Sequence, residues 1–274
     1  MRTGTKPPAP ATDDAKARLE MVAVAGLIGI GAAVVFVGWP QLDVTVSGYF
    51  HLGPRNFALR HSELAETIRE GFKLLNLTSG ILVVLATAAV IAQGRRFLSL
   101  GLAHWGFLAL VLIVGPGLLA NSTLKDNWGR PRPIQITEFG GPGAFAPALA
   151  RTGPCERNCS FVSGEASSTF ALGFALTLLA RRRRAAWMAA GLAAGSVVGL
   201  IRIGQGGHFL SDVIFAAVFM ALVVAAMHLL VFRLLASRVP GEAWWHERAV
   251  SAGQALRRQA ASAAAVETRA RSAN

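Results

Sequence analysis

Six long apolar runs dominate the chain and limit what it can fold into. They cover roughly residues 21–39, 75–93, 98–120, 161–180, 185–205 and 209–232. A helix needs about 20 apolar residues to cross a hydrocarbon core of about 30 Å. Because lipid offers the backbone no hydrogen-bond partners, runs of this kind must be helical. The sequence therefore predicts an all-α integral membrane protein, a bundle of six transmembrane helices.

The distribution of basic residues predicts the orientation of this bundle. The chain has 27 Lys and Arg against 15 Asp and Glu, a formal charge of +12. If the first run crosses outward, 17 of the 27 lie on the starting side, and the positive-inside rule makes that side cytoplasmic. Both termini are then cytoplasmic. The basic excess reflects topology and contact with lipid headgroups, so we expect the bilayer as a partner and no nucleic acid.

Three segments follow from this reading. We expect a disordered cytoplasmic N-terminus at 1–20, a six-span membrane domain at 21–236, and a basic cytoplasmic tail at 237–274. The first run lacks a small-x-small cleavage pattern, so we interpret it as an uncleaved anchor. Residues 1–17 and those beyond 250 are expected to be mobile.

A short amphipathic segment lies between the first two runs. Leu64, Ile68 and Phe72 recur at i, i+4 spacing among charged residues. This pattern predicts a short periplasmic helix that lies on the outer membrane surface. A helix that caps the bundle fits the same pattern.

The segment RIGQGGHFLSD contains a candidate nucleophile. Asp212 follows His208 by four residues, which places both side chains on one face of a helix. The carboxylate can then hold the imidazole Nδ1–H and leave Nε2 free to attack a phosphorus atom. The glycines before His208 predict a turn that opens the last span, whose N-terminus favours an anion. We interpret His208 as the nucleophile and Asp212 as the residue that orients it.

Four basic residues are candidates for binding phosphate oxygens. Lys125, Arg130 and Arg132 lie within eight residues in KDNWGRPR, and Arg202 ends the fifth span. Guanidinium groups bind phosphate through paired hydrogen bonds, and Lys adds a compact charge. The alternatives are a basic surface loop for the first three, and for Arg202 a headgroup contact or an ion pair with Asp212.

Ser163 and Gly164 open the fourth span, where a hydroxyl and unpaired amides can cradle an anion. The small residues that follow suit close helix packing equally well. Under the predicted topology, the loops at 121–163 and 202–212 both face the periplasm. All three clusters are therefore expected to form one active site there.

These motifs resemble those of the type 2 phosphatidic acid phosphatase superfamily, which comprises integral membrane lipid phosphate phosphatases. Its pattern is Lys-x6-Arg-Pro, then Pro-Ser-Gly-His, then Ser-Arg-x5-His-x3-Asp. The first and third motifs match here at Lys125, Arg132, Pro133, Arg202, His208 and Asp212. The resemblance implies an enzyme without metal or cofactor that forms a phosphohistidine on His208. It also implies phosphoryl binding by Lys125, Arg132 and Arg202, with help from Ser163 and Gly164.

The middle motif departs from the family pattern. The chain has Val162-Ser163-Gly164-Glu165, so Glu165 stands where the resemblance implies a histidine that protonates the leaving oxygen. The variant is similar to that of bacterial lipid A phosphatases. If its pKa is raised near phosphate, Glu165 can act as the general acid. The alternative is that Glu165 pairs with Arg130 or Lys125 and supplies no proton.

The only two cysteines, Cys155 and Cys159, lie in the same outward loop. In an oxidising periplasm they can form a disulfide, and otherwise they are free thiols. Two thiols without a nearby histidine do not predict a metal site.

Together these features predict a phosphatase of the bacterial inner membrane. Its substrate would be a lipid phosphomonoester or diphosphate, with phosphatidic acid, phosphatidylglycerol phosphate, undecaprenyl diphosphate and lipid A as candidates. A lipid phosphotransferase would use the same phosphohistidine. A non-enzymatic lipid phosphate binding or transport protein is the other alternative, although the spans carry few polar residues for it.

Overall fold

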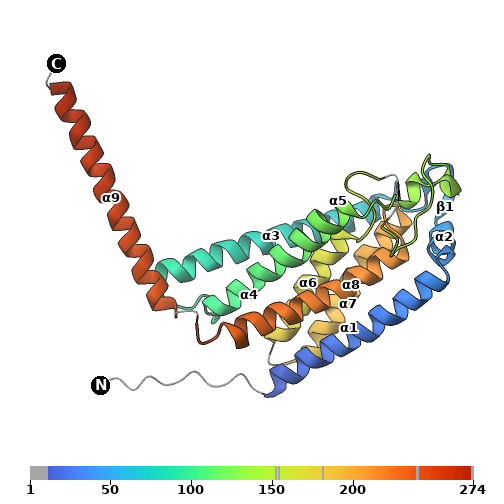
Figure 1. Ribbon diagram of the computed structural model, residues 1–274, viewed down its shortest axis with the longest axis horizontal. Helices are drawn as coiled ribbons and strands as arrows, with labels where there is room; N and C mark the ends of the chain where they lie inside the picture. The colour runs from blue at the N-terminus through green and yellow to red at the C-terminus, as the bar shows by residue number, and fades with distance from the viewer. Residues whose placement is uncertain (1–11, 152, 154, 181, 239–240, 273–274) are drawn as a thin grey trace.

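The computed structural model describes residues 12–151, 153, 155–180, 182–238 and 241–272. Within these, the chain is mostly helical, with an antiparallel hairpin of β1 (His51–Gly53) and β2 (Asn56–Phe57) and a long loop over 128–163 that contains two short 3-10 turns. The long helices lie side by side, and most of the loops gather at one end of the bundle (Figure 1). The first described helix begins at the opposite end, and the last one starts there and extends away from the bundle (Figure 1). The predicted all-α class is confirmed.

Five helical segments are long and apolar enough to cross a membrane. They are α1 (Thr12–Gly38), α3 (Glu63–Gln93), α4 (Leu102–Leu112) with the π-helix Ile113–Leu124 and α5 (Lys125–Asn127), α7 (Arg184–Gly204), and α8 (Leu210–Leu229) with the π-helix Leu230–Leu234. The outer helices expose large aliphatic side chains, such as Leu27 on α1 and Leu77 on α3. Such surfaces suit contact with lipid.

The fourth predicted span, α6 (Gly164–Leu179), is not among these five and is a shorter helix at the centre of the bundle. It has 16 residues, which gives a length of about 24 Å at 1.5 Å per residue. The span was predicted to begin at residue 161. The backbone is still extended at Ser163, so the helix begins at Gly164. Because its neighbours surround it, α6 has no need to match the full thickness of the bilayer. The predicted six-span count is therefore approximate.

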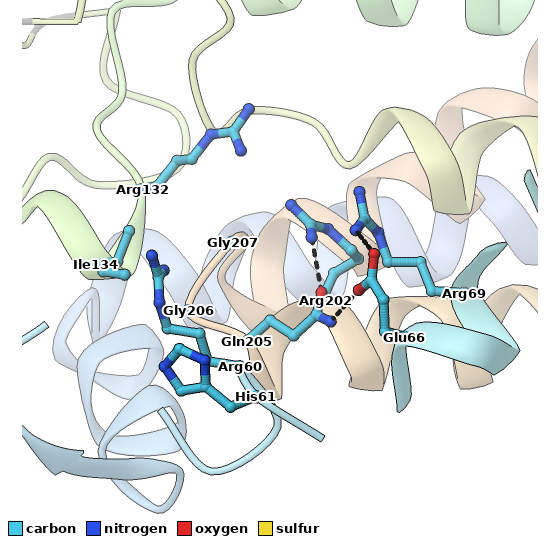
Figure 2. Close-up of a pocket in the computed structure, with 10 residues that line it drawn as sticks. All are labelled: Arg60, His61, Glu66, Arg69, Arg132, Ile134, Arg202, Gln205, Gly206 and Gly207. Carbon is cyan, nitrogen blue, oxygen red and sulfur yellow. Dashed lines mark hydrogen bonds and ion pairs between the residues drawn. The ribbon is translucent and has the colours of Figure 1, made fainter. Parts of the chain in front are cut away.

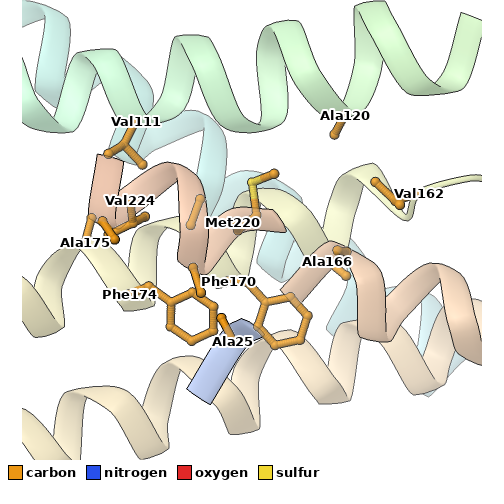
Figure 3. Close-up of a cluster of buried hydrophobic side chains, with 14 of the residues drawn as sticks. Ala25, Val111, Ala120, Val162, Ala166, Phe170, Phe174, Ala175, Met220 and Val224 are labelled. Atoms are coloured by element: carbon orange, nitrogen blue, oxygen red, sulfur yellow. The ribbon is translucent and has the colours of Figure 1, made fainter. Parts of the chain in front are cut away.

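Small residues let α6 approach α7 closely. A Cβ atom added to Gly173 would lie 2.4 Å from the Cα of Gly191, so neither position has room for a side chain. Such close packing drives helix association in lipid. Beside this contact, Phe170 and Phe174 of α6 stack on each other, and the ring of Phe170 lies against Gly195 of α7. Both rings belong to the same core as Met220 of α8 (Figure 3). This packing fixes the start of α6, which carries part of the site.

The amphipathic segment at 64–72 is not a separate helix. It forms the first turns of α3, which runs unbroken from Glu63 because Ser62 caps its N-terminus and no proline interrupts it. Both expectations for this segment, a surface helix or a cap on the bundle, are therefore wrong. This change brings the charged side chains of α3 to the loop end of the bundle.

The chain ends also differ from the prediction. Residues 12–17 belong to α1, and the tail forms α9 (Glu242–Ser272), although both were expected to be mobile. Alanine and arginine, which dominate the tail, favour helix even without tertiary packing. Residues 1–11 lie outside the described part of the chain.

Candidate active site

Two backbone hydrogen bonds draw the predicted clusters together at the loop end of the bundle. The amide of Cys159 donates to the carbonyl of Lys125 over 2.9 Å. The amide of Ser163 donates to the carbonyl of Asp212 over 3.3 Å, which joins the start of α6 to the start of α8. Residues almost 90 positions apart in the sequence thus form one site.

His208 is buried with one ring nitrogen engaged. Its side chain is 1% exposed, and Nδ1 lies 2.7 Å from the backbone carbonyl oxygen of Ser160. A carbonyl oxygen only accepts, so Nδ1 donates and Nε2 keeps its lone pair. Burial lowers the pKa of His208 to about 4, against the opposing effect of the Asp212 carboxylate. The imidazole is therefore neutral at pH 7, as a nucleophile must be.

Asp212 is not the closest partner of His208. Its Oδ2 lies 3.6 Å from Nδ1, too far for a normal hydrogen bond. The same oxygen accepts from the hydroxyl of Ser160 over 2.5 Å and from the amide of Phe209 over 2.8 Å. Asp212 thus fixes Ser160, and Ser160 in turn holds the imidazole. The expectation of a direct Asp212–His208 hydrogen bond is corrected in this way.

Arg130 does not face the site. It is fully buried, and its Nη1 donates to Asp212 and Ser211, its Nη2 to Asp43 of α2 (Gln41–Gly48), and its Nε to the carbonyl of Ala146. Since every nitrogen of the guanidinium already donates, the predicted role of Arg130 in phosphate binding is corrected. It ties α2 to the start of α8. No sequence pattern pointed to Asp43.

Two cations lie directly against glycines of the site. A Cβ atom added to Gly164 would lie 2.8 Å from the Nζ of Lys125, and one added to Gly207 would lie 2.4 Å from the Nη2 of Arg202. The ammonium thus covers the start of α6, and the guanidinium covers the turn that precedes His208. Both charges also disfavour protonation of His208.

Two buried polar atoms near these cations lack partners. Within the described part of the chain, the hydroxyl of Ser163 and the Nε of Arg202 make no hydrogen bond. Buried donors without partners are costly, and such atoms are rare in folded proteins. An oxygen-rich anion is the kind of ligand that would satisfy both.

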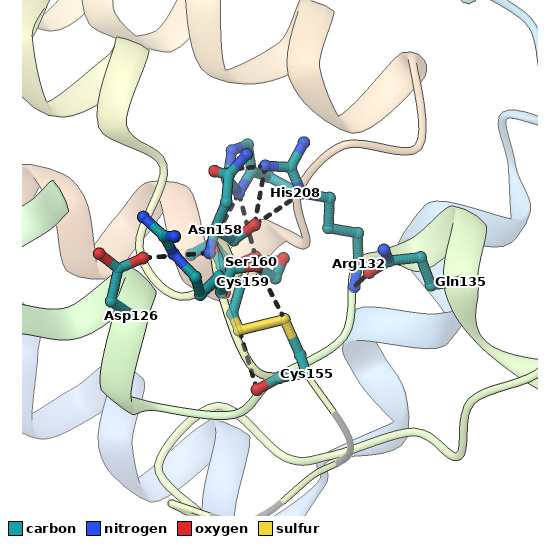
Figure 4. Close-up of a disulfide and its surroundings, with 10 residues drawn as sticks. Asp126, Arg132, Gln135, Cys155, Asn158, Cys159, Ser160 and His208 are labelled. Atoms are coloured by element: carbon teal, nitrogen blue, oxygen red, sulfur yellow. Dashed lines mark hydrogen bonds and ion pairs between the residues drawn. A yellow bond between two sulfur atoms is a disulfide. The ribbon is translucent and has the colours of Figure 1, made fainter.

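A disulfide stiffens the segment that holds Arg132. Cys155 and Cys159 are joined in the structure, and the five-residue ring that they close contains Asn158 (Figure 4). The Nη2 of Arg132 donates to the backbone carbonyl of Asn158 over 2.9 Å and to its side-chain oxygen over 2.8 Å. The guanidinium of Arg132 is therefore positioned by the disulfide loop.

Glu165 pairs with a residue that sequence reasoning missed. The Nε and Nη2 of Arg69, on α3, donate to its two carboxylate oxygens, each over 2.8 Å. The Nε of Arg202 lies 4.0 Å from the same carboxylate. Two guanidinium groups favour the charged form of Glu165, so the expected protonated carboxyl does not fit these surroundings. Neither of its predicted partners, Arg130 and Lys125, forms the pair.

This pair extends into a ring of polar side chains beside a cavity. Arg69 also donates to Glu66 over 2.7 Å, Gln205 donates to Glu66 over 3.0 Å, and Arg202 donates to Gln205 over 2.7 Å. The cavity has a volume of about 280 Å³, with Arg202 and Arg69 on one wall and Arg132 on the other (Figure 2). Arg132 and Arg202 therefore line a basic cavity that lies next to the turn preceding His208.

Comparison with known proteins identifies the family. Residues 104–236 match the PAP2 superfamily. A lipid A 4'-phosphatase of Francisella tularensis subsp. novicida (strain U112) is 32% identical over 213 residues, which cover 74% of this chain and 95% of that protein. Lipid A 4'-phosphatases of Rhizobium etli (33% over 199 residues, 65% and 75% of the two chains) and Rhizobium leguminosarum (46% over 117 residues, 42% and 50%) are also similar. No solved structure matches. The chain belongs to the PAP2 superfamily.

Membership in the PAP2 superfamily confirms the predicted enzyme class, a lipid phosphate phosphatase, in a bacterial multi-pass membrane protein. The matched segment contains the whole series from Lys125 to Asp212. Glu66 and Arg69 precede it, so the α3 side of the cavity lies outside the region matched to the PAP2 superfamily. Among the described residues, no cluster of His, Cys, Asp and Glu is placed to hold a metal ion.

Proposed function

We propose that this protein hydrolyses a phosphomonoester on lipid A or a similar phosphorylated glycolipid, through a phosphohistidine intermediate. The observation that carries the proposal is the buried, neutral His208, whose Nδ1 donates to the carbonyl of Ser160 and whose surroundings contain two cations, Lys125 and Arg202. The substrate is suggested by the relatives, which are named for lipid A 4'-phosphatase activity.

The reaction proceeds in two displacements. The Nε2 lone pair of His208 attacks phosphorus, a P–N bond forms, and the P–O bond to the lipid breaks, so that the lipid leaves as an alkoxide that takes up a proton. Water then attacks the phosphohistidine, the P–N bond breaks, and inorganic phosphate leaves. Lys125, Arg132 and Arg202 stabilise the charge on the phosphoryl oxygens in both transition states. The hydroxyl of Ser163 and the amide of Gly164 supply further donors at the start of α6.

In this scheme Glu165 acts as a carboxylate that holds Arg202 and Arg69 in place. Its bidentate ion pair with Arg69 supports this role over that of a general acid. A proton for the leaving oxygen then comes from water. Replacement by Gln separates the two roles, because the amide keeps the shape but carries neither charge nor a transferable proton. A general acid would be needed most for poor leaving groups, whereas a positioning residue would affect all leaving groups equally.

We further propose that the site faces the periplasm and that both termini are cytoplasmic. The excess of basic residues at the other end supports this orientation, and a disulfide beside the site suits an oxidising compartment. An impermeant thiol reagent tests it on Glu138→Cys and Ala249→Cys variants that lack the two native cysteines. We expect labelling of position 138 alone in intact cells. Labelling of position 249 alone would show that the protein has the opposite orientation.

Phosphate release by the purified protein tests the activity. We expect wild type to release phosphate from lipid A in detergent micelles without added divalent metal, and His208→Gln to release none. A pulse with ³²P-labelled substrate should leave an acid-labile label on wild type only. Release by His208→Gln at the wild-type rate would exclude His208 as the nucleophile. Phosphate that appears on a second lipid instead of in solution would favour a phosphotransferase.

A further inference from the structure

The cavity beside His208 has a basic wall that the phosphate site does not use. Arg60 and His61, which precede α3, line the cavity across from Arg202 and Gln205 (Figure 2). In the described part of the chain, neither Arg60 nor His61 makes a side-chain hydrogen bond or ion pair. The other arginines that line the cavity are all engaged by protein groups. Among the described arginines that line the cavity, Arg60 is thus the one whose guanidinium has no protein partner.

Backbone contacts fix this wall relative to the nucleophile. The amide of Leu59 donates to the carbonyl of Gly204 over 2.9 Å. A Cβ atom added to Gly206, whose φ is +68°, would lie 2.6 Å from the ring of Phe57. The segment before Arg60 therefore rests on the glycine turn that carries His208. The position of Arg60 is set by this packing and not by a free loop.

The segment of Arg132 rests on the same turn. The amide of Ile134 donates to the carbonyl of Gly206 over 3.1 Å, which places the segment of Arg132 beside the turn as well. One glycine turn thus holds the nucleophile, a phosphate-binding arginine and Arg60. Groups fixed on one element keep a constant separation, as recognition of two anionic groups on one molecule requires.

We propose that Arg60, assisted by His61, binds a second anionic group on the headgroup of the same substrate. This inference rests on the proposed phosphatase function and extends it to the choice of substrate. A guanidinium without a protein partner is suited to bidentate binding of a phosphate or carboxylate. The cavity volume of about 280 Å³ is close to that of small-molecule sites, and such a site accepts more of a headgroup than the scissile phosphate.

Two matched substrates test this subsite in neutral detergent micelles. Both carry the same acyl chains and one scissile phosphomonoester, and only one also carries a methyl phosphodiester, which is anionic but not a monoester. For Arg60→Gln we expect kcat/KM to fall about tenfold or more with the doubly anionic substrate relative to the other. Arg55→Gln, in the turn between β1 and β2 and not among the residues that line the cavity, is the control and should not change this ratio. His61→Gln should give a smaller change in the same direction.

The outcomes separate the subsite from the proposed function. Equal losses on both substrates, or no loss on either, would overturn the subsite while phosphate release still supports the phosphatase. If wild type releases no phosphate from either substrate, the proposed function is wrong and the subsite with it. A third arm adds an anionic phospholipid to the micelles. If Arg60→Gln discriminates only then, Arg60 binds a neighbouring lipid and not the substrate.

Discussion

Arg130 and Arg202 lie at the same end of the bundle, both nearly inaccessible, yet their surroundings differ. Arg130 is 0% exposed and donates from all three of its nitrogens to protein oxygens. Arg202 is 8% exposed, its Nε has no partner in the described chain, and the nearest carboxylate, that of Glu165, is 4.0 Å away. All three nitrogens of Arg130 thus have protein acceptors, whereas the Nε of Arg202 has none among the described residues.

This difference separates a structural cation from one that binds a ligand. A buried charge is costly unless paired, and the two carboxylates around Arg130 meet that requirement within the protein. Arg202 is only partly paired, so an anion in the cavity completes its surroundings. The state of the donors, and not burial or proximity to the nucleophile, distinguishes the two arginines.

Arg130→Met should give the largest effect. Its removal leaves Asp43 and Asp212 buried without their shared cation, at a cost of about 3–5 kcal/mol in the free energy of unfolding. Thermal unfolding of the purified protein in detergent measures this loss. Arg132→Met, two residues away on a half-buried side chain, is the matched control, and we expect it to lose activity with little loss of stability. Equal stability of the two variants would mean that Arg130 is not structural.

Arg202→Gln should show the reverse. We expect kcat to fall by about 10²–10³, the usual cost of removing one charged donor to a transition state, with the unfolding temperature close to that of wild type. Arg202→Lys should restore only part of the activity, because an ammonium cannot donate in the same paired geometry. If Arg202→Gln were as unstable as Arg130→Met, Arg202 would also be a structural cation, and the distinction between the two arginines would fail.

The sequence predicted much of the site but could not separate these arginines. The spacing of His208 and Asp212 placed both at the start of one helix, since local spacing dictates local geometry. Arg130 and Arg132 are chemically identical and two residues apart in KDNWGRPR. The two carboxylates that pair with the buried Arg130, Asp212 and Asp43, lie 82 and 87 residues away, and no local pattern reports such partners.

The same limit explains why the sequence did not predict the ion-pair partner of Glu165. Its partner Arg69 lies 96 residues away, in a segment whose pattern predicted a surface helix. Apolar runs predicted the outer helices well because lipid imposes their length and composition. They overstated α6, because a central helix is shielded by its neighbours and needs fewer residues. Long-range ion pairs and central positions are tertiary properties, and a single sequence reveals neither.

A double-mutant cycle would sharpen the view of Glu165 as a positioning residue. We expect Arg69→Met and Glu165→Gln each to lower kcat/KM about tenfold, and the double variant to lose little more, because each change breaks the same ion pair. Lys73→Met is the control, since Lys73 also lies on α3 but, among the described residues, pairs with Glu70 and not with Glu165. Fully additive losses, or a Glu165→Gln loss confined to poor leaving groups, would return Glu165 to the role of general acid.

Opening the disulfide should have a smaller effect. Because the loop of Cys155 and Cys159 presents Asn158 to Arg132, we expect reduction to raise KM a few-fold and leave kcat nearly unchanged. Asn158→Gly removes the side-chain oxygen but tolerates the positive φ of this residue, and should raise KM similarly. Reduction should then add little to Asn158→Gly. A loss of kcat instead would mean that the disulfide supports the nucleophile.

The smallest effect is expected for pH. The protonation state of His208 should not change near neutral pH. Burial lowers the pKa of His208 to about 4, so protonation removes its lone pair only as the pH falls through that value, and not near the usual pKa of about 6.5. The second pKa of a substrate phosphate, about 6, obscures this in rate profiles. NMR of ¹⁵N-histidine, with the signal assigned by its absence in His208→Gln, avoids the problem. We expect the Nδ1–H tautomer to persist unchanged from about pH 8 to about pH 5. A transition to the doubly protonated ring near pH 6.5 would show that burial does not keep the nucleophile neutral, and that the Asp212 carboxylate outweighs Arg202 and Lys125 in its surroundings.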